Sequence, residues 1–334
     1  MRYRIVEDRL GAAFDCVADD VVLRAGLRVG VPLAYECNVG GCGSCKFELL
    51  DGQIVDVWPA APGLSERDRL RGRHLACQSR PISDCRIRMI GRGEVDGAPL
   101  PKRMVATLAG IEDLTHDMRE FRFRVDDGAA FRPGQYALLS LPGVPVGRAY
   151  SMSNIDNDAG EWHFIIRRVP AGMATPVLFD LEPGAPVRLD GPYGRAYLRP
   201  NAGHNVVCIA GGSGLSPMVG IARGLDRAAL PAECRFDFFY GGRSAADICG
   251  EAFLRALPRI GNRLHFHPVV SSDDVGWTGR KGMVHELLAD LPAETFARTE
   301  FYLAGPPPMV EAVVALLARR RAVPAERIHY DRFF

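Results

Sequence analysis

The chain has 334 residues, and its 41 Lys and Arg against 40 Asp and Glu leave a formal net charge of +1. This balance argues against nucleic acid as a partner, and the length predicts two or three domains. No apolar run is long enough to span a membrane and the first residues do not resemble a secretion signal, so we expect a cytosolic protein. We also expect a monomer.

Short strands are predicted near the start of the chain, at residues 3–6 and 46–50, with a short helix over residues 21–27. Residues 92–101 are rich in Gly and Pro and have no hydrophobic period, which is typical of a linker. We therefore predict a first domain over residues 1–91 that ends at this linker.

Residues 102–200 are predicted to form a small antiparallel β-barrel, because alternating apolar segments follow one another with turn residues between them. One helix is expected in this domain, at residues 174–181. The expected strands are residues 105–108, 120–125, 136–141, 162–169 and 186–189.

Residues 201–334 alternate between strand and helix patterns, which predicts a doubly wound parallel sheet with its ligand at the carboxyl ends of the strands. The expected strands are residues 206–210, 236–240, 264–270 and 301–304. The expected helices are residues 215–227, 252–257, 284–291 and 309–320.

Four cysteines have the order C-x4-C-x2-C followed by a distant fourth, which is the ligand spacing of plant-type 2Fe-2S centres. They are Cys37, Cys42, Cys45 and Cys77. The glycines between the first three are expected to take positive φ and to turn amide groups toward sulfur; they are Gly40, Gly41 and Gly43. The alternative is a structural zinc site, but such sites usually contain two close cysteine pairs and this chain has one.

The other cysteines have no ligand spacing, and we expect them to be small apolar core residues. They are Cys16, Cys85, Cys208, Cys234 and Cys249.

In the barrel segment, Arg148, Tyr150 and Ser151 form the pattern R-x-Y-S. A guanidinium suits paired phosphates and an aromatic ring suits a flat apolar ring, although a surface arginine on an ordinary strand is the alternative. The pattern resembles the flavin signature of the ferredoxin-NADP reductase superfamily. That resemblance implies that Arg148 binds the FAD pyrophosphate, Tyr150 lies on the isoalloxazine and Ser151 meets its N5 region, so Tyr150 and Ser151 are candidate catalytic residues.

The segment 166–175 resembles the part of the same superfamily in which a turn of small residues opens a helix. Free amide groups at a helix start can bind a pyrophosphate. The candidate cofactor-binding residues here are Ile166, Arg167, Gly172, Met173 and Thr175.

A glycine-rich turn follows the first apolar strand of the third domain and opens a helix, which suits a dinucleotide pyrophosphate. Its form is G-x-G-x-x-P, which resembles the same superfamily and not a Rossmann dehydrogenase. The candidate residues are Gly212, Ser213, Gly214 and Pro217.

The next strand ends at Arg243, where the adenosine ribose is expected. Arg243 could bind a 2'-phosphate, but no second base follows it, and an acidic residue such as Asp247 favours a free ribose hydroxyl. We therefore predict NADH over NADPH.

Two further sites follow from the resemblance. Gly305 and Pro306 belong to a segment like the superfamily's C-G-P-x-x-M turn beside the nicotinamide, with Ala304 in place of the usual Cys. The terminal aromatic of relatives covers the flavin face that the nicotinamide must reach. Phe334 is thus a candidate catalytic lid and cofactor contact, with a frayed tail as the alternative.

The three sites together resemble the NADH reductase components of bacterial oxygenases, and most closely the toluene monooxygenase reductases; the barrel segment also resembles naphthalene dioxygenase reductases. The resemblance implies a β-grasp ferredoxin domain, bound FAD and a 2Fe-2S cluster. It implies electron flow from NADH through these groups to a diiron hydroxylase or a Rieske ferredoxin of an aromatic monooxygenase system. The alternatives are service to a Rieske dioxygenase or a cytochrome P450, and, more remotely, a redox sensor without turnover.

Overall fold

The computed structural model describes residues 1–95, 97–200 and 203–334. Two compact units are present, Met1–Arg103 with Asp190–Pro192 and Phe334, and Met104–Leu189 with Tyr193–Phe333. Asp96 of the predicted linker lies outside the described residues, as do residues 201–202 at the predicted boundary between the second and third domains. Within the described ranges, no helix has the length and apolar character needed to cross a bilayer.

The first unit contains a five-stranded sheet in the order β2-β1-β7-β3-β5, with β1 and β7 parallel and the other pairs antiparallel. This is the expected ferredoxin-like sheet. The predicted strands belong to it, and the predicted short helix is α1. Its elements are β1 (Arg2–Glu7), β2 (Ala12–Val17), α1 (Val22–Arg28), β3 (Lys46–Asp51), β4 (Ile54–Asp56), α2 (Glu66–Leu70), β5 (Arg73–Leu75), β6 (Ser79–Pro81) and β7 (Cys85–Met89).

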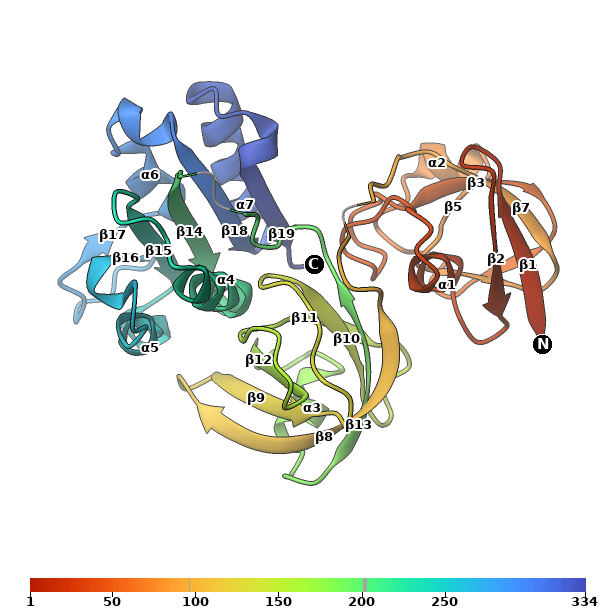
Figure 1. Ribbon diagram of the computed structural model, residues 1–334, viewed down its shortest axis with the longest axis horizontal. Coiled ribbons are helices and arrows are strands. Elements are labelled where there is room, and N and C mark those ends of the chain that lie inside the picture. Colours follow the sequence, from red (N-terminus) through yellow and green to blue (C-terminus); the bar gives the residue numbers. More distant parts are fainter. Residues whose placement is uncertain (96, 201–202) are drawn as a thin grey trace. The chain divides into compact units, whose positions relative to one another are not determined.

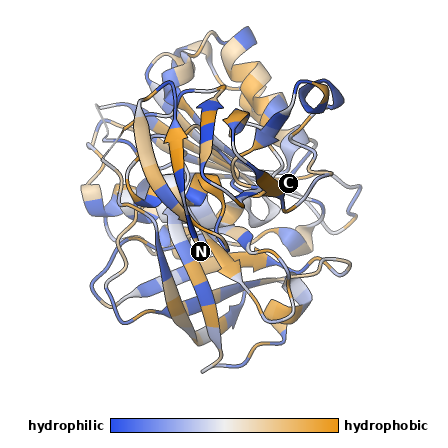
Figure 2. Cartoon of the chain, turned by 90° about the vertical axis from the view of Figure 1, so that its right-hand side faces the viewer, coloured by the Kyte–Doolittle hydropathy of each residue, from blue (hydrophilic) through white to orange (hydrophobic). Residues whose placement is uncertain are grey.

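Alternate strand residues and one face of α1 form the core of this unit. Ile5, Phe14, Phe47 and Ile87 point from the strands to the same cluster as Leu23 of the helix. Hydrophobic and hydrophilic residues alternate along several strands, as the hydropathy colours of Figure 2 show. One face of the sheet is therefore buried under α1 and the cysteine loop.

The first part of the second unit is a six-stranded antiparallel sheet in the order β11-β10-β13-β8-β9-β12 (Figure 1). A bridge between Met152 and Phe164 joins the chain beyond β11 to β12 and nearly closes the barrel, as predicted. The helix is shorter than expected. The elements are β8 (Lys102–Asp113), β9 (Met118–Arg124), β10 (Tyr136–Ser140), β11 (Arg148–Ser151), β12 (Glu161–Arg167), α3 (Thr175–Phe179) and β13 (Pro186–Tyr193).

The second part of this unit is a parallel sheet in the order β17-β16-β15-β14-β18-β19. The direction of the strand order reverses between β14 and β18, which is where such sheets bind ligands. Its strands are β14 (Asn205–Gly211), β15 (Phe236–Gly242), β16 (Leu264–Val270), β17 (Arg280–Lys281), β18 (Thr299–Gly305) and β19 (Ile328–Arg332). Its helices are α4 (Leu215–Ala228), α5 (Glu251–Arg255), α6 (Val284–Ala289) and α7 (Pro307–Ala315), which a π-turn extends to Arg320.

Both faces of the parallel sheet are buried, as the near-continuous apolar strands predict. Along β14, Cys208 and Ala210 contribute to the core that contains α4, whereas Val207 and Ile209 contribute to the core that contains α6 and α7. Figure 1 shows α4 on the side of this sheet that faces the barrel.

Candidate cluster and nucleotide-binding sites

The four candidate cluster cysteines are arranged as two pairs. Cys37, Cys42 and Cys45 lie on the loop between α1 and β3, and Cys77 lies between β5 and β6. The sulfurs of Cys37 and Cys42 share one hydrogen bond, and those of Cys45 and Cys77 share another. Two pairs of thiols match the requirement of a cluster whose two irons each take two thiolates.

In each pair the shared hydrogen bond lowers the pKa of one thiol and, together with burial, raises the pKa of the other, Cys37 or Cys45; iron binding requires all four thiols to ionise. Hydrogen bonding from the Cys37 thiol lowers the pKa of Cys42, against the effect of burial, and the Ser44 amide lies 3.4 Å from the Cys42 sulfur. Hydrogen bonding from the Cys45 thiol lowers the pKa of Cys77, and the Gln78 amide lies 3.7 Å from that sulfur.

The backbone of this loop differs from the prediction at one glycine. Gly40 and Gly43 have the expected positive φ, at +89° and +77°, but Gly41 does not. Asn38 takes the left-handed conformation instead, at φ +56°, because a short amide side chain tolerates that region. At Gly43 the need for glycine is also steric, since a Cβ would lie 2.4 Å from the Gly63 carbonyl oxygen.

Asn38 carries the clearest sign that this loop is built around a further group. Its side chain is 1% exposed, and within the described chain neither Nδ2 nor Oδ1 has a hydrogen-bond partner. A buried amide without a partner is costly, and here it follows a candidate ligand directly. A sulfur-rich cluster held by the four cysteines would give Nδ2 an acceptor, so the residues present fit a 2Fe-2S group.

Removal of this amide is expected to make the cluster harder to reduce. Hydrogen bonds to cluster sulfurs help to set its potential, and Asn38→Gly keeps the positive φ while it deletes the donor. We expect the midpoint potential to fall by on the order of 50 mV, the equivalent of about one hydrogen bond for a one-electron couple. EPR-monitored titration measures it. Asn38→Asp, which replaces the donor by a carboxylate, should lower the potential further, and an unchanged potential in both variants would contradict this role.

The R-x-Y-S residues lie on β11, at the edge of the barrel sheet. Arg148 and Tyr150 are half-buried and, two residues apart, share one face of the strand. Burial raises the pKa of Tyr150 to about 12, so its hydroxyl is neutral at physiological pH. Ser151 is buried at the end of the strand. An aromatic ring beside a half-buried guanidinium suits a flavin, and these residues could hold FAD.

The residues of segment 166–175 differ in how far they are buried. Ile166 is part of the barrel core, whereas Gly172 is half-buried and Met173 is 62% exposed. The Thr175 hydroxyl accepts from the Val169 amide at 2.9 Å and lies 3.1 Å from its carbonyl oxygen. Thr175 therefore closes the turn that leads into α3, and its place in a cofactor site remains a prediction.

Two glycine-containing turns meet at the carboxyl ends of the neighbouring strands β14 and β18. A Cβ on Gly214 would lie 2.0 Å from the Ala304 carbonyl oxygen, and one on Gly305 would lie 3.3 Å from the Gly211 amide nitrogen. At Gly214 only glycine permits this approach, and at Gly305 the φ of +156° also favours glycine. The turn 212–214 begins α4 at the point where the strand order reverses, which is the position expected for a dinucleotide. Ser213 is half-buried, Pro217 is buried and Pro306 is exposed.

The chain matches three family descriptions. The 2Fe-2S iron-sulfur cluster binding domain matches residues 5–81, the Oxidoreductase FAD-binding domain residues 105–197 and the Oxidoreductase NAD-binding domain residues 208–315. The ferredoxin–NAD(P)(+) reductase CarAd of Metapseudomonas resinovorans is 41% identical over 96% of both chains.

The chain belongs to the ferredoxin–NAD(P)+ reductases.

Other relatives agree with this assignment over nearly the whole chain. The reductase is 38% identical to the ferredoxin–NAD(+) reductase component of the alkene monooxygenase system of Xanthobacter autotrophicus, over 97% of this chain and 98% of that one. It is similar to a solved ferredoxin reductase in carbazole 1,9a-dioxygenase, with a TM-score of 0.91, 38% identity and coverage of 100% and 99%. The reductase thus has a 2Fe-2S domain, an FAD domain and an NAD domain.

Asp247 has a structural role that the sequence did not indicate. Its carboxylate accepts from the backbone amides of Arg243 and Ser244, at 3.0 and 2.9 Å, and it pairs with Arg167 of the barrel. Burial alone would raise the pKa of Asp247, but the hydrogen bonds from Ser244 and the charge of Arg167 bring it below its usual value. The carboxylate therefore shapes the turn after β15, and contact with a ribose remains a prediction.

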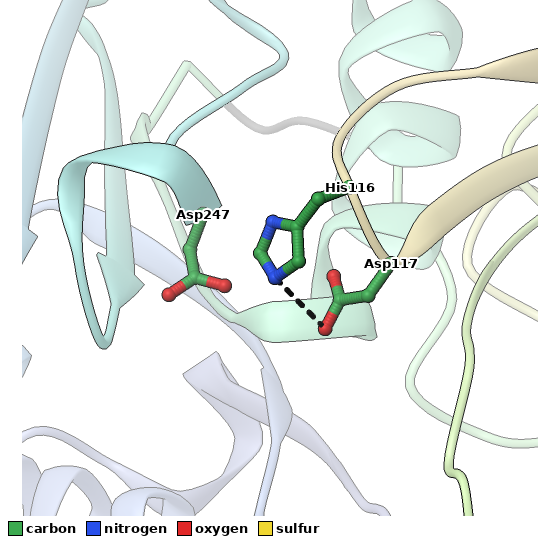
Figure 3. A group of neighbouring side chains, drawn as sticks. All are labelled: His116, Asp117 and Asp247. Carbon is green, nitrogen blue, oxygen red and sulfur yellow. Dashed lines mark ion pairs between the residues drawn. The ribbon is translucent and has the colours of Figure 1, made fainter.

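His116, Asp117 and Asp247 offer three potential ligand atoms within 4.8 Å of one another (Figure 3). His116 and Asp117 come from the turn between β8 and β9, and Asp247 comes from the turn after β15. The Arg167 guanidinium contacts both carboxylates, with its Nε 2.8 Å from Asp117. Because this cation already pairs with both acids, we interpret the group as an ion-pair network that joins the FAD and NAD domains.

The remaining predictions have mixed outcomes. Cys16, Cys85, Cys208 and Cys234 are buried as expected, whereas Cys249 is half-buried. Phe334 is 58% exposed and belongs to the first unit, and Arg243 is exposed. The proposed lid role of Phe334 and the ribose contact of Arg243 stay predictions.

Proposed function

We propose that this reductase carries electrons from NADH through FAD to its 2Fe-2S cluster, and from there to a component of an oxygenase system. The observation that supports this most is the presence in one chain of a paired-cysteine loop, an R-x-Y-S strand and a glycine turn at the switch point of a parallel sheet. Similar reductases carry names that place them in alkene monooxygenase and carbazole dioxygenase systems.

Different residues of the chain would bind FAD, the nicotinamide nucleotide and the cluster. NADH donates two electrons together as a hydride, whereas the acceptors take one electron at a time. FAD, when bound, supplies the chemistry that connects them, because it can accept a hydride and release single electrons. Arg148 would hold its pyrophosphate, and Tyr150 would pack on its ring as a neutral phenol. The turns 212–214 and 305–306 would bind the nicotinamide nucleotide. The four cysteines would hold the cluster that passes electrons outward.

For the partner, we propose the terminal hydroxylase of an aromatic hydrocarbon monooxygenase, or the Rieske ferredoxin that serves it. The cluster segment supports this choice, since Trp58 to Leu64 and Leu75 to Gln78 resemble toluene monooxygenase reductases. A Rieske dioxygenase or a cytochrome P450 is the second candidate, because similar solved structures are a ferredoxin reductase in carbazole 1,9a-dioxygenase and an Amycolatopsis cytochrome P450 reductase. Reconstitution with a purified member of each class, with product formation as the readout, tests the choice; turnover with only a dioxygenase or P450 would reject it.

The electron route is tested by anaerobic addition of NADH to the purified protein. Both the flavin and the iron-sulfur absorbance should bleach, and electrons should then pass to a soluble one-electron acceptor in steady turnover. Reduction of the flavin alone would reject the route through the cluster. Bleaching without turnover for any acceptor would favour a redox sensor.

We expect NADH to be preferred over NADPH by about tenfold in kcat/KM, the effect of about 1.4 kcal/mol of unfavourable phosphate binding. Arg243 is exposed beyond β15, and no second base follows it through Asp247. Ala246→Arg, at an exposed position in this turn, should supply a second cation for the 2'-phosphate and raise NADPH use. Steady-state kinetics with both nucleotides measure the ratio. Ala246→Gln is the uncharged control, and equal wild-type use of NADH and NADPH would contradict the prediction.

A further inference from the structure

Ser216, in the first turn of α4, joins the FAD domain to the NAD domain by two hydrogen bonds. Its Oγ donates to the Ser151 carbonyl oxygen at 2.6 Å and accepts from the Ile165 amide at 2.9 Å. Ser216 and Ser151 are 2% and 6% exposed, and Ile165 is also buried. One hydroxyl thus satisfies a donor and an acceptor of the barrel backbone, on two different strands.

One partner of Ser216 belongs to the candidate flavin site. Ser151 ends the R-x-Y-S strand, and the Ser151 carbonyl is one residue from Tyr150. Ser216 itself lies two residues after Gly214, the last residue of the glycine turn. A shift of α4 relative to β11 would therefore move the dinucleotide turn relative to the flavin strand.

The same face of α4 is shaped for close approach to the barrel. Gly220 and Gly224 follow Ser216 at intervals of four residues, so the three lie on one face of the helix. A Cβ on Gly220 would lie 2.8 Å from the Met152 carbonyl oxygen, and one on Gly224 would lie 2.7 Å from Pro133. Arg223, beside them, donates to the Ser153 carbonyl oxygen at 2.8 Å. The barrel segment 151–153 thus meets α4 through three successive carbonyl groups.

We infer that Ser216 is a positioning residue that fixes the distance between the nicotinamide-binding turn and the flavin-binding strand. The inference rests on the proposed transfer from NADH to FAD. Hydride transfer depends steeply on the alignment of the reacting groups. Ser216 touches neither group in this role; it acts through the Ser151 backbone and the first turn of α4.

The test is anaerobic stopped-flow reduction of the full-length, FAD-loaded protein by NADH. Ser216→Ala leaves a buried carbonyl and a buried amide without a partner, and we expect the limiting rate of flavin reduction to fall by about tenfold or more. The dissociation constant for NADH and the FAD content should change little. Ser216→Thr, which keeps the hydroxyl, should recover most of the rate.

Thr299→Val is the matched control. Thr299 is buried in the same domain, and its hydroxyl donates to the Thr295 carbonyl oxygen. It begins β18, at the end of the strand opposite the nicotinamide-binding turn at Gly305. The control variant should lower the Tm without changing the rate of flavin reduction. Wild-type reduction rates in Ser216→Ala, or an equal loss in Thr299→Val, would overturn the inference. If Ser216→Ala does not fold, Ser216→Cys gives the same test, with a rate below that of the wild type as the expected result. Failure of NADH to reduce the wild-type flavin would instead reject the proposed function.

Discussion

Cys42→Ser is expected to abolish NADH-driven reduction of cytochrome c, with a loss of about 100-fold or more, on the scale of metal-site losses. The Cys42 sulfur is paired with Cys37 and accepts from the Ser44 amide, so the substitution would remove one of the four candidate thiolates of the cluster. Reduction of ferricyanide, a small acceptor that can take electrons from the flavin, should be largely retained. The ratio of the two activities, together with iron content, measures the effect.

Cys85→Ser is the matched control for this experiment. Cys85 is buried in the same unit but lies outside the loop, and its sulfur contacts the Gln53 and Ser83 carbonyl oxygens at 3.4 and 3.3 Å. A serine hydroxyl can make the same bonds, so this variant should keep its iron and both activities. Full cytochrome c reduction by Cys42→Ser would place the electron exit elsewhere.

Arg148→Ala is expected to yield protein depleted of FAD. A hydrogen bond to a charged group contributes about 1.5–3 kcal/mol, so FAD affinity should fall by about 10- to 100-fold. Flavin absorbance after gel filtration measures the depletion, and the gain in Tm on addition of FAD should be smaller than in the wild type. The iron content should be unchanged, because the cluster cysteines lie in the other unit.

Two variants separate the role of the Arg148 side chain from that of charge alone. Arg148→Lys keeps the charge without the planar fork, so its FAD affinity should be intermediate. Arg124→Ala removes an exposed arginine of the same barrel that pairs with Glu161 at 3.0 Å, and it should retain FAD. Undiminished FAD in Arg148→Ala would remove this residue from the site.

The placements that the sequence could predict are those of residues in short continuous segments. Three candidate cluster cysteines share one loop, and the glycine turn lies between an apolar strand and a helix, so their spacing alone determines that they lie close together. The strands β5 and β6 were missed because each has three residues, too few for a period to be recognised. The positive φ expected at Gly41 was wrong, since Asn38 makes that reversal instead.

Contacts between distant segments could not be predicted in this way. Arg167 pairs with Asp247, 80 residues later, and no spacing rule connects them. Ser216 was visible only as an unassigned position inside G-x-G-x-x-P, because its partners Ser151 and Ile165 are backbone groups that any residue could provide. The signal that could have drawn attention to it is the recurrence of small residues at 216, 220 and 224 along one predicted helix.

The contact between α4 and barrel residues 151–153 also has a consequence for the exchange of domains between such enzymes. The barrel contributes main-chain carbonyls at 151, 152 and 153, and these persist whatever side chains a host barrel carries. If the NAD domain were fused to a foreign flavin domain, the fit of the two would depend chiefly on three residues of the NAD domain. These are the Ser216 hydroxyl, the Arg223 guanidinium and Gly220, which has no side chain. We therefore expect a foreign barrel to offer these three carbonyl groups without any redesign of its side chains.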